Sequence, residues 1–515
     1  MVNTDDNNGS NGAVTPQLKI KVRGDAVILT KISEKVLQAY HKIALERGVG
    51  GKHSHYELSV KPVSGVGENS YGLILQVCMR ECFSVARETE AEENMSFNHN
   101  PKEMVTILKI SPKNPSFRAH SRIADLYKRE VFMYKQVFSQ FKQLQAECQE
   151  HQDNSYQFDN VPELLFTCLD VEDEFLILED LSQSGFKQNQ RTEMPTYELA
   201  SATFRSIAKF HAMSFVLQAK KPQQFKEFVQ QMDDNLFTED IEPITVEFGK
   251  KYIRKTRVML QQSEVKSQST AVAKQIKGLQ KLEDNFKRVC LQSVNGQLIA
   301  PYAVICHGDF WNNNMLYGNR NNAEQTTSAK LIDFQLSRYA SPILDLVHYL
   351  YTSTEGDLRK KYFEELLDTY FEHLKAHISY HNLIIDDIYP KKIFMQQLKD
   401  YGIYGFCMAA FSIPFFISTS SELPDLDVVA TAIRDISSTS SENSDEEMHE
   451  NGNAKDADIG VTVNAKSDAD SKRMELLEEY DLLNERTLPI FKRRMCDIVK
   501  DLDKYDMLDI ILKLS

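Results

Sequence analysis

The stretch His307–Leu316, "HGDFWNNNML", interrupts a region where the flanking residues predict a buried, extended chain. The apolar run "YAVIC" precedes it, and the apolar pair "ML" ends it. Between them stand a Gly, an Asp, the only Trp of the chain and three consecutive Asn. A surface turn is the simplest interpretation, because Gly, Asn and Asp supply the backbone conformations that turns need. Whether the stretch is more than a turn depends on what the rest of the chain places around it.

The composition is that of a soluble globular protein with a large core. The chain has 515 residues, of which 42% are apolar and 26% charged. A net charge of −14 argues against a general nucleic-acid binder, which would carry a basic face. The eight cysteines are scattered, with no CxxC pair and no metal-ligand spacing, so we expect free thiols in a reducing compartment and no structural zinc.

Two segments bear on targeting and membranes. Residues 1–16 contain no apolar run and predict a disordered tail. The segment Tyr401–Ile417, "YGIYGFCMAAFSIPFFI", has about the length of a minimal membrane span. Its internal Pro414, its glycines and its lack of basic flanks favour a buried core helix instead. We therefore expect a cytoplasmic, monomeric protein that binds neither membranes nor nucleic acid.

The chain changes character along its length. Up to about residue 180 it mixes helix with strand-like runs, among them 71–79 and 104–110, which a charged hairpin loop connects. Beyond that point helical periodicity dominates, including a long amphipathic stretch over 256–291. Residues 436–471 are rich in Ser and acidic residues and nearly lack bulky apolar ones, so we expect a disordered insertion.

A lysine and a glutamate occupy positions where apolar residues are expected. Lys109 lies inside the strand-like run "VTILKI", although a lone lysine there usually lies at a sheet edge and reaches water. Glu130 replaces one member of the apolar stripe of a helix predicted over 121–145. A buried carboxylate is costly unless a cation meets it, and Lys109 is the nearest candidate. A strand Lys paired with a helix Glu is how kinases hold the α and β phosphates of ATP.

A glycine-containing segment precedes this pair. In "SGVGENSYG" the spacing Gly65-x-Gly67-x-x-Ser70 resembles a loop that covers phosphates, and Asn69 lies within it. Glycines in a hairpin are common, so the segment alone carries little weight. The order of loop, strand Lys and helix Glu makes coincidence the weaker interpretation.

The stretch His307–Leu316 can then be interpreted as part of a site for phosphoryl transfer. Phosphoryl transfer needs a carboxylate near the attacking hydroxyl and oxygen ligands for Mg²⁺. Asp309 supplies the carboxylate, and Asn314, five residues later, supplies an amide oxygen. Asp333 ends the apolar run "AKLID" and supplies a second metal ligand. Trp311 either walls the acceptor site or packs in the core.

These segments together resemble a known family. The pattern His-x-Asp followed five residues later by Asn is similar to that of aminoglycoside phosphotransferases and choline kinases. More closely, the chain resembles the insect ecdysteroid-kinase-like (CHK kinase-like) family. The supporting segments span nearly the whole chain, and they are "GENSYG", "ILKI", "REVFMY", "LILEDLSQSGF", "IAKFHAMSF", "HGDFWNNNML", "LIDFQLSRYASPILDLVHYL" and "YGIYGF". Ser-Tyr-Gly in the glycine loop and the acidic insertion depart from the family pattern.

The resemblance implies an α+β, protein-kinase-like fold of two lobes. It implies an N-terminal antiparallel sheet with one main helix and a larger, mostly helical C-terminal lobe. The domain boundaries follow: a tail (1–16), an N-lobe (17–178), a hinge and C-lobe (179–435), an insertion (436–471) and C-terminal helices (472–515). By the same resemblance, Glu179 and Leu181 in "LEDL" belong to a hinge whose backbone meets adenine, and His307 is the motif histidine, which in such loops more often orients backbone than transfers protons.

The implied activity is ATP- and Mg²⁺-dependent phosphorylation of a small alcohol. The family is implicated in phosphorylating ecdysteroids and foreign compounds, so both remain as acceptors. A catalytically silent binding protein of the same fold remains the alternative. A protein kinase is disfavoured, because only 12 residues separate Asp333 from Asp345, which leaves no room for an activation segment. His211 is expected to be a core residue and Asp345 to brace the catalytic loop. The aromatic stretch Tyr401–Phe416 either lines an acceptor pocket or packs in the core.

Overall fold

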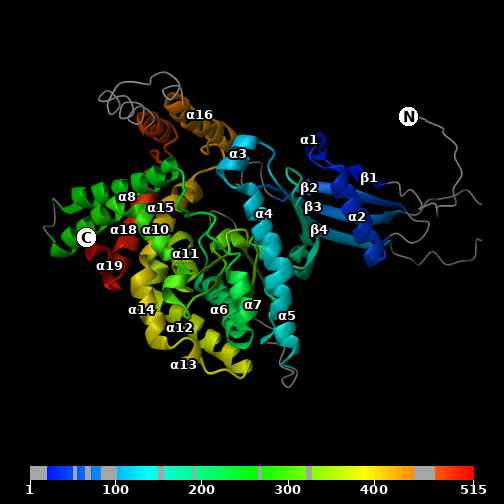
Figure 1. Ribbon diagram of the computed structural model, residues 1–515, viewed down its shortest axis with the longest axis horizontal. Coiled ribbons are helices and arrows are strands. Elements are labelled where there is room, and N and C mark those ends of the chain that lie inside the picture. The colour runs from blue at the N-terminus through cyan, green and yellow to red at the C-terminus, as the bar shows by residue number, and fades with distance from the viewer. Residues whose placement is uncertain are drawn as a thin grey trace, which may run out of the picture.

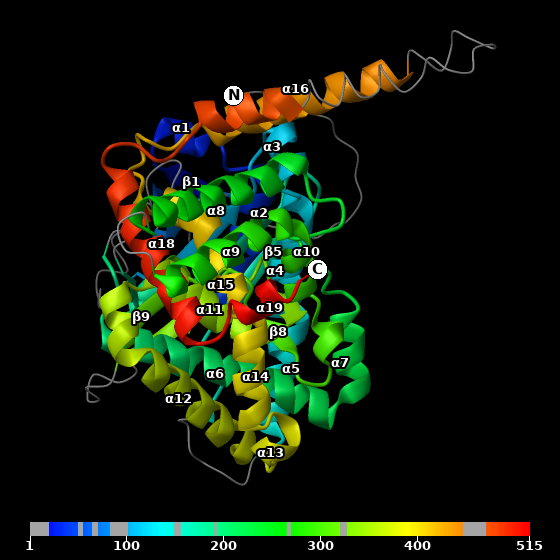
Figure 2. The same ribbon diagram turned by 90° about the vertical axis from the view of Figure 1, so that its left-hand side faces the viewer.

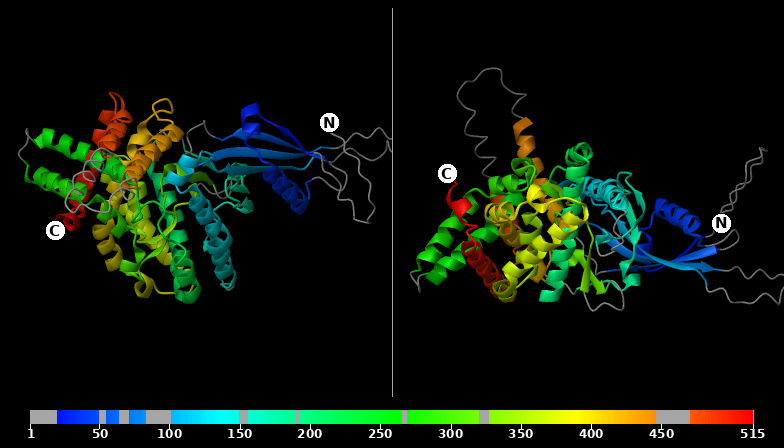
Figure 3. Two further views of the ribbon diagram at one scale, coloured as in Figure 1. Left: turned by 45° about the horizontal axis from the view of Figure 1, so that its top comes forward. Right: turned by 90° about the horizontal axis from the view of Figure 1, so that it is seen from below.

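The computed structural model describes residues 20–49, 55–63, 71–82, 101–148, 156–189, 193–264, 269–319, 327–445 and 470–514. They form two lobes, a smaller one built around a sheet and a larger one that is mostly helical (Figure 1). Figure 3 shows the sheet and α2 projecting to one side of the helical lobe. The two-lobed, kinase-like fold class predicted from the sequence is confirmed.

A six-stranded sheet forms the smaller lobe, in the order β1-β2-β3-β4-β6-β5. Its strands are β1 (Ile20–Arg23), β2 (His55–Pro62), β3 (Leu73–Cys82), β4 (Glu103–Ile110), β5 (Leu164–Cys168) and β6 (Phe175–Glu179). The predicted hairpin is present, since β3 and β4 pair in antiparallel register. The sheet is antiparallel as predicted except at one edge, where the short β1 runs parallel to β2.

Helices cover both faces of this sheet, which the prediction of one main helix did not foresee. Because side chains alternate along a strand, Ile177 packs with helix α2 (Glu34–Arg47) while Leu176 faces the opposite way. Leu176 belongs to the cluster that contains α4 (Ile123–Phe132) and α5 (Phe138–Ala146). The two short helices α1 (Ala26–Leu29) and α3 (Pro115–His120) complete the lobe.

The helix predicted over 121–145 is present with one irregularity. A π-helical turn, Met133–Val137, joins α4 to α5. The turn inserts a residue's worth of backbone, so the apolar stripe steps from Leu126 to Met133 and Val137 and still faces the core. Glu130 lies on this stripe and is 1% exposed. The sequence therefore located the buried carboxylate correctly.

The larger lobe is built on long packed helices. Helix α6 (Tyr197–Lys220) packs along α12 (Gly356–Tyr380), and α11 (Ile343–Ser353) packs on α15 (Ile403–Ile417). The amphipathic stretch predicted over 256–291 is helical, and it is divided among α8 (Pro243–Glu264), α9 (Thr270–Asp284) and α10 (Phe286–Ser293). The remaining helices of the lobe are α7 (Pro222–Val229), α13 (Ile385–Ile388), α14 (Lys391–Tyr401), α16 (Leu426–Asp445), α18 (Thr487–Lys504) and α19 (Asp509–Leu512).

The aromatic stretch Tyr401–Ile417 is a core element, as predicted. Its residues from Ile403 to Ala410 are all buried, and Pro414 lies inside α15. Among the described residues, no single helix is long and apolar enough to span a membrane, although α14 and α15, bent by 47°, meet the length and composition criteria as a pair.

The predicted acidic insertion begins later than expected. Helix α16 continues through Asp445, so the first ten residues of the segment 436–471 are helical. Its N-terminal part crosses to the smaller lobe and contacts α3 (Figure 2). Helix resumes over 470–479, and the residues 446–469 between them lie outside the described residues.

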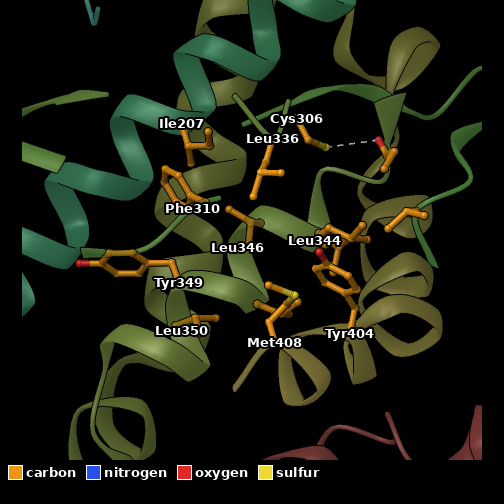
Figure 4. Packing of buried hydrophobic residues seen from close by; sticks show 14 of the residues in the cluster. Ile207, Cys306, Phe310, Leu336, Leu344, Leu346, Tyr349, Leu350, Tyr404 and Met408 are labelled. Atoms are coloured by element: carbon orange, nitrogen blue, oxygen red, sulfur yellow. Dashed lines mark hydrogen bonds between the residues drawn. The ribbon is translucent and has the colours of Figure 1, made fainter. Parts of the chain in front are cut away.

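The core of the larger lobe lies directly beneath the stretch His307–Leu316. Phe310 and Leu336 point into the same cluster as Leu346 and Tyr349 (Figure 4). Phe334 is fully buried at the junction of the lobes. Its ring lies 4.8 Å from that of Phe138, 5.6 Å from that of Phe210 and 4.6 Å from that of His307, centroid to centroid.

Because Phe334 joins α5, α6 and the loop at His307, we expect Phe334→Ala to lower the free energy of unfolding by about 3–5 kcal/mol. Leu169→Ala is the matched control, since that side chain is 38% exposed and should cost less than about 0.5 kcal/mol. Urea denaturation of both variants measures the difference. Equal midpoints for the two would contradict a packing role for Phe334.

Candidate active site

The stretch His307–Leu316 is a supported loop and not a surface turn. It begins after β8 (Val304–Cys306), passes through a 3₁₀ turn at Asn312–Asn314 and enters β9 (Met315–Asn319). The surrounding strands are β7 (Lys187–Gln188), β10 (Thr327–Leu331) and β11 (Arg338–Ala340). β8 pairs with β11, while β9 lies between β7 and β10. The loop is therefore held at both ends.

Gly308 is required by the path of this loop. Its φ is +87°, which favours glycine, and a Cβ atom built there would lie 1.8 Å from the carbonyl oxygen of Leu336. The guanidinium of Arg338, itself buried, donates to the Gly308 carbonyl at 3.1 Å and to the hydroxyl of Tyr404 at 2.8 Å. Backbone and cation together fix the start of the loop.

Asp345 anchors the backbone at the start of the same loop. Its two carboxylate oxygens accept the backbone N–H groups of His307 at 2.7 Å and Gly308 at 3.0 Å. Nε2 of His211 lies 3.0 Å from the same carboxylate. Although burial alone would raise the pKa of Asp345, the contact with His211 holds that pKa below its usual value. The bracing position predicted for Asp345 and the core position predicted for His211 are confirmed.

His307 orients Asp309, which lies two residues further along the chain. Its Nδ1 accepts the backbone N–H of Asp309 at 3.3 Å, and its Nε2 lies 3.0 Å from the carbonyl oxygen of Ile332. The carbonyl must accept, so Nε2 carries the proton. Burial lowers the pKa of His307, which keeps the ring neutral. These contacts fit an orienting residue better than a proton carrier.

Asp309 and Asn314 meet, as their spacing predicts. Nδ2 of Asn314 donates to the carboxylate of Asp309 at 3.0 Å and to its backbone oxygen at 2.9 Å. Burial, aided by the charge of Asp333, raises the pKa of Asp309 to about 7, while hydrogen bonds from Asn314 and the Trp311 side chain oppose the rise. A carboxylate poised near neutrality is suited to accept a proton from an alcohol.

Lys109 is the centre of a second cluster, which joins the two lobes. Its Nζ lies 2.6 Å from Oε2 of Glu130, 2.7 Å from Oδ1 of Asp333 and 3.1 Å from Oε1 of Gln335. An ammonium has three donors, and here each has an acceptor. The predicted Lys109–Glu130 ion pair is confirmed, and both side chains are almost fully buried.

The two carboxylates of this cluster keep the Lys109 ammonium charged. Burial works to lower the pKa of Lys109, but the carboxylates of Asp333 and Glu130 raise it well above its usual value, so the lysine stays protonated. Asp333 has a φ of +68°, an uncommon left-handed conformation for a residue other than glycine. The turn directs its carboxylate at Lys109, and Nε2 of Gln335 donates to the other oxygen at 3.3 Å.

Two residues of this site were missed in the sequence. Gln335 follows Asp333 by two residues, and only that proximity could have indicated it. Tyr71 was quoted within the glycine segment but given no role. Burial raises the pKa of Tyr71, and the charges of Asp309 and Asp333 add to the rise, so Tyr71 shares the electrostatic environment of the site.

The remaining predicted site residues are not joined to these two clusters in the described part of the chain. Glu179 ends β6, and Leu181 begins the 3₁₀ turn Leu181–Ser184, with its side chain buried. No contact joins either residue to the two clusters within the described part of the chain, and their contact with adenine stays a prediction. Gly65, Gly67, Asn69 and Ser70 lie outside the described residues.

The donor set fits a divalent cation of the Mg²⁺ type. Asp333 and Asn314 offer a carboxylate and an amide oxygen, the ligands that hard cations prefer. One oxygen of Asp333 pairs with Lys109, so a cation bound there would share this carboxylate with the lysine. The charge of Asp333 raises the pKa of Asp309, and a cation held by Asp333 would offset that charge.

One comparison with known protein families assigns the chain to a family. A family model, described as the ecdysteroid kinase-like family, matches residues 81–383, more than half of the chain. Among solved structures, the chain is similar to an ethanolamine kinase of Plasmodium vivax, with 10% identity, a TM-score of 0.34, and coverage of 87% of this chain and 95% of that one. It is also similar to the GDP complex of aminoglycoside 2'-phosphotransferase-IIIa, with 10% identity, a TM-score of 0.27, and coverage of 85% and 98%. No curated protein matches the sequence.

The raised pKa of Asp309 predicts that Asp309→Asn stabilises the metal-free protein near neutral pH. The folded state keeps the Asp309 proton up to pH about 7, whereas the unfolded chain releases it near pH about 3.9. Stability from this group is therefore lost as pH rises between these values, and the variant avoids that loss. In EDTA, the melting-temperature gain of Asp309→Asn should be small at pH 5 and larger at pH 7.5. A gain that does not change with pH would contradict the environment described for Asp309.

Proposed function

Because the chain belongs to the ecdysteroid kinase-like family, we propose that it is an ATP-dependent small-molecule kinase that phosphorylates a hydroxyl group in the cytoplasm. One observation carries the proposal: two clusters with distinct tasks adjoin each other, since the backbone N–H of Ile332, next to Asp333, donates to the backbone oxygen of Asn314 at 3.1 Å. Lys109 with Glu130 and Asp333 supplies a cation and a metal ligand, and Asp309 with Asn314 supplies a base and a second ligand.

The residues divide the work of phosphoryl transfer between them. Lys109, kept charged and positioned by Glu130, binds phosphate oxygens of the nucleotide. Asn314 and Asp333 would hold Mg²⁺, which would supply positive charge to offset that of the phosphates. Asp309 accepts the hydrogen bond of the acceptor hydroxyl, orients its oxygen toward the terminal phosphate and takes up its proton. His307 and Asp345 fix the backbone of Asp309 so that this orientation is built in before the substrate arrives.

The acceptor is a small and largely apolar alcohol, for which an ecdysteroid is the first candidate. The family description supports this class, and the stacked rings of Trp311 and Phe416, 3.9 Å apart, supply an apolar surface beside Asp309. A foreign compound of similar character is the alternative within the same reaction. A catalytically silent binding protein is disfavoured, because the residues proposed as base, lysine and metal ligands are all present, with Lys109 paired to Asp333 and Asp309 paired to Asn314.

We expect Asp309→Asn to lower kcat by roughly 100-fold or more, the usual effect of removing a positioned base. The amide keeps the size of the side chain, so folding and nucleotide binding should persist. Phosphate transfer from labelled ATP to ecdysone or another turned-over alcohol measures the effect. Asp357→Asn, a change of the same kind at the start of α12, is the control. If Asp309→Asn retained full activity, Asp309 would be only a turn residue.

We expect Mg-ATP to raise the melting temperature of the wild-type protein and Lys109→Met to abolish that shift, because a ligand that binds only the folded state stabilises it. The variant itself should be less stable, since Glu130 and Asp333 lose their buried cation. The shift is therefore measured against each variant's own ligand-free value. Lys113→Met, at an exposed lysine beyond the end of the same strand, is the control. A full shift in Lys109→Met would remove the lysine from the nucleotide site.

A further inference from the structure

Arg129 is a buried cation on α4 to which the proposed reaction assigns no task. It is 7% exposed and stands directly before Glu130, the buried partner of Lys109. Neighbouring residues of an α-helix point about 100° apart, so one helix can direct two adjacent side chains to different parts of the molecule. Burying a guanidinium is costly unless acceptors meet it. The acceptors of Arg129 therefore show what holds this face of α4.

The acceptors of Arg129 are two backbone carbonyl oxygens, and both belong to the larger lobe. Nη1 donates to the carbonyl of Ser337 at 2.5 Å, and Nη2 donates to the carbonyl of Asp233 at 2.9 Å. A planar guanidinium presents its donors in a fixed fork, so it can serve two separate acceptors in one geometry. Arg129 therefore joins a helix of the smaller lobe to the backbone of the larger lobe at two points.

Ser337 connects Arg129 to both clusters of the site. It lies four residues after Asp333, which accepts from Nζ of Lys109 at 2.7 Å. The hydroxyl of Ser337 donates to the carbonyl oxygen of His307 at 3.2 Å. The carbonyl group that Arg129 binds is therefore close in the chain to the proposed metal ligand and one residue's hydrogen bond away from the catalytic loop.

A second buried arginine holds the loop at Asp233. The carboxylate of the next residue, Asp234, lies 3.0 Å from Nη1 of Arg338, and Arg338 in turn donates to the carbonyl of Gly308. Burial lowers the pKa of Arg129 to about 10 although the charge of Asp234 opposes the change, so Arg129 stays a cation at neutral pH. The loop is held by contacts that do not involve Arg129, and it gives α4 a fixed point of attachment.

We propose that Arg129 is a positioning residue for the kinase reaction, which fixes α4 against the larger lobe so that Glu130 and Asp333 meet Lys109 together. The inference rests on the proposed function, because this arrangement matters for turnover only if Lys109 binds the nucleotide. When the two hydrogen bonds are lost, α4 can shift relative to Asp333, and Lys109 no longer meets both carboxylates at once. Since Arg129 binds backbone carbonyls and acts through Glu130, it is not a catalytic residue.

The test is isothermal titration of Mg-ATP into variants that each lose one positive charge. Arg129→Gln should raise the Kd at least roughly tenfold, the scale of one hydrogen bond to a charged group. Lys128→Gln, the same loss of charge at the adjacent exposed residue of α4, should leave the Kd unchanged. Arg359→Gln removes a buried arginine of the larger lobe that pairs with Asp501, so it should lower the melting temperature without raising the Kd.

Arg129→Lys separates positioning from folding. It keeps the charge but not the planar fork, so it should restore part of the affinity and give a Kd between those of the wild type and Arg129→Gln. A wild-type Kd in folded Arg129→Gln, or an equal rise in Arg359→Gln, would overturn the proposal. If Arg129→Gln does not fold, a wild-type Kd in Arg129→Lys would overturn it instead.

The wild-type titration distinguishes this proposal from the proposed function. A folded wild-type protein that does not bind Mg-ATP would contradict the kinase function, and the positioning role would be lost with it. Binding by the wild type that persists unchanged in Arg129→Gln would overturn the positioning role alone.

Discussion

The structure depends most on one buried cation. Lys109 lies on a central strand of the smaller lobe, yet one of its carboxylate partners, Asp333, belongs to the larger lobe. Three acceptors within 3.1 Å satisfy its three donors and offset the cost of burying the charge. The pairing fixes α4 against the sheet and the turn at Asp333 against α4. Every later feature of the site is positioned relative to this arrangement.

The second constraint is the backbone of the catalytic loop. Gly308 permits a close approach to Leu336 that any side chain would block, and Asp345 holds the two N–H groups before Asp309. These contacts hold the Asp309 carboxylate in a position where burial and the charge of Asp333 raise its pKa to about 7. The raised pKa of Asp309 is what the base proposed for this position would need at neutral pH.

The sequence was informative wherever a residue contradicted its local pattern. Lys109 in an apolar strand and Glu130 on an apolar stripe predicted their own ion pair, and the Asp309–Asn314 contact followed from the spacing of five residues. Gln335 could not be found in this way, because a polar residue after a strand breaks no pattern. Its importance arises from Lys109, which is distant in the chain. The parallel edge strand β1 and the π-helical turn were missed because both depend on tertiary packing.

The account is tested most directly by looking for the reaction itself. Purified protein is incubated with Mg²⁺, ATP labelled in its terminal phosphate and an extract of small molecules, and the products are separated by mass. The account predicts at least one apolar alcohol that gains a single labelled phosphate with the wild-type protein and not with Asp309→Asn. A folded wild-type protein that binds Mg-ATP but labels no small molecule, or labels the same one when Asp309 is replaced, would contradict it.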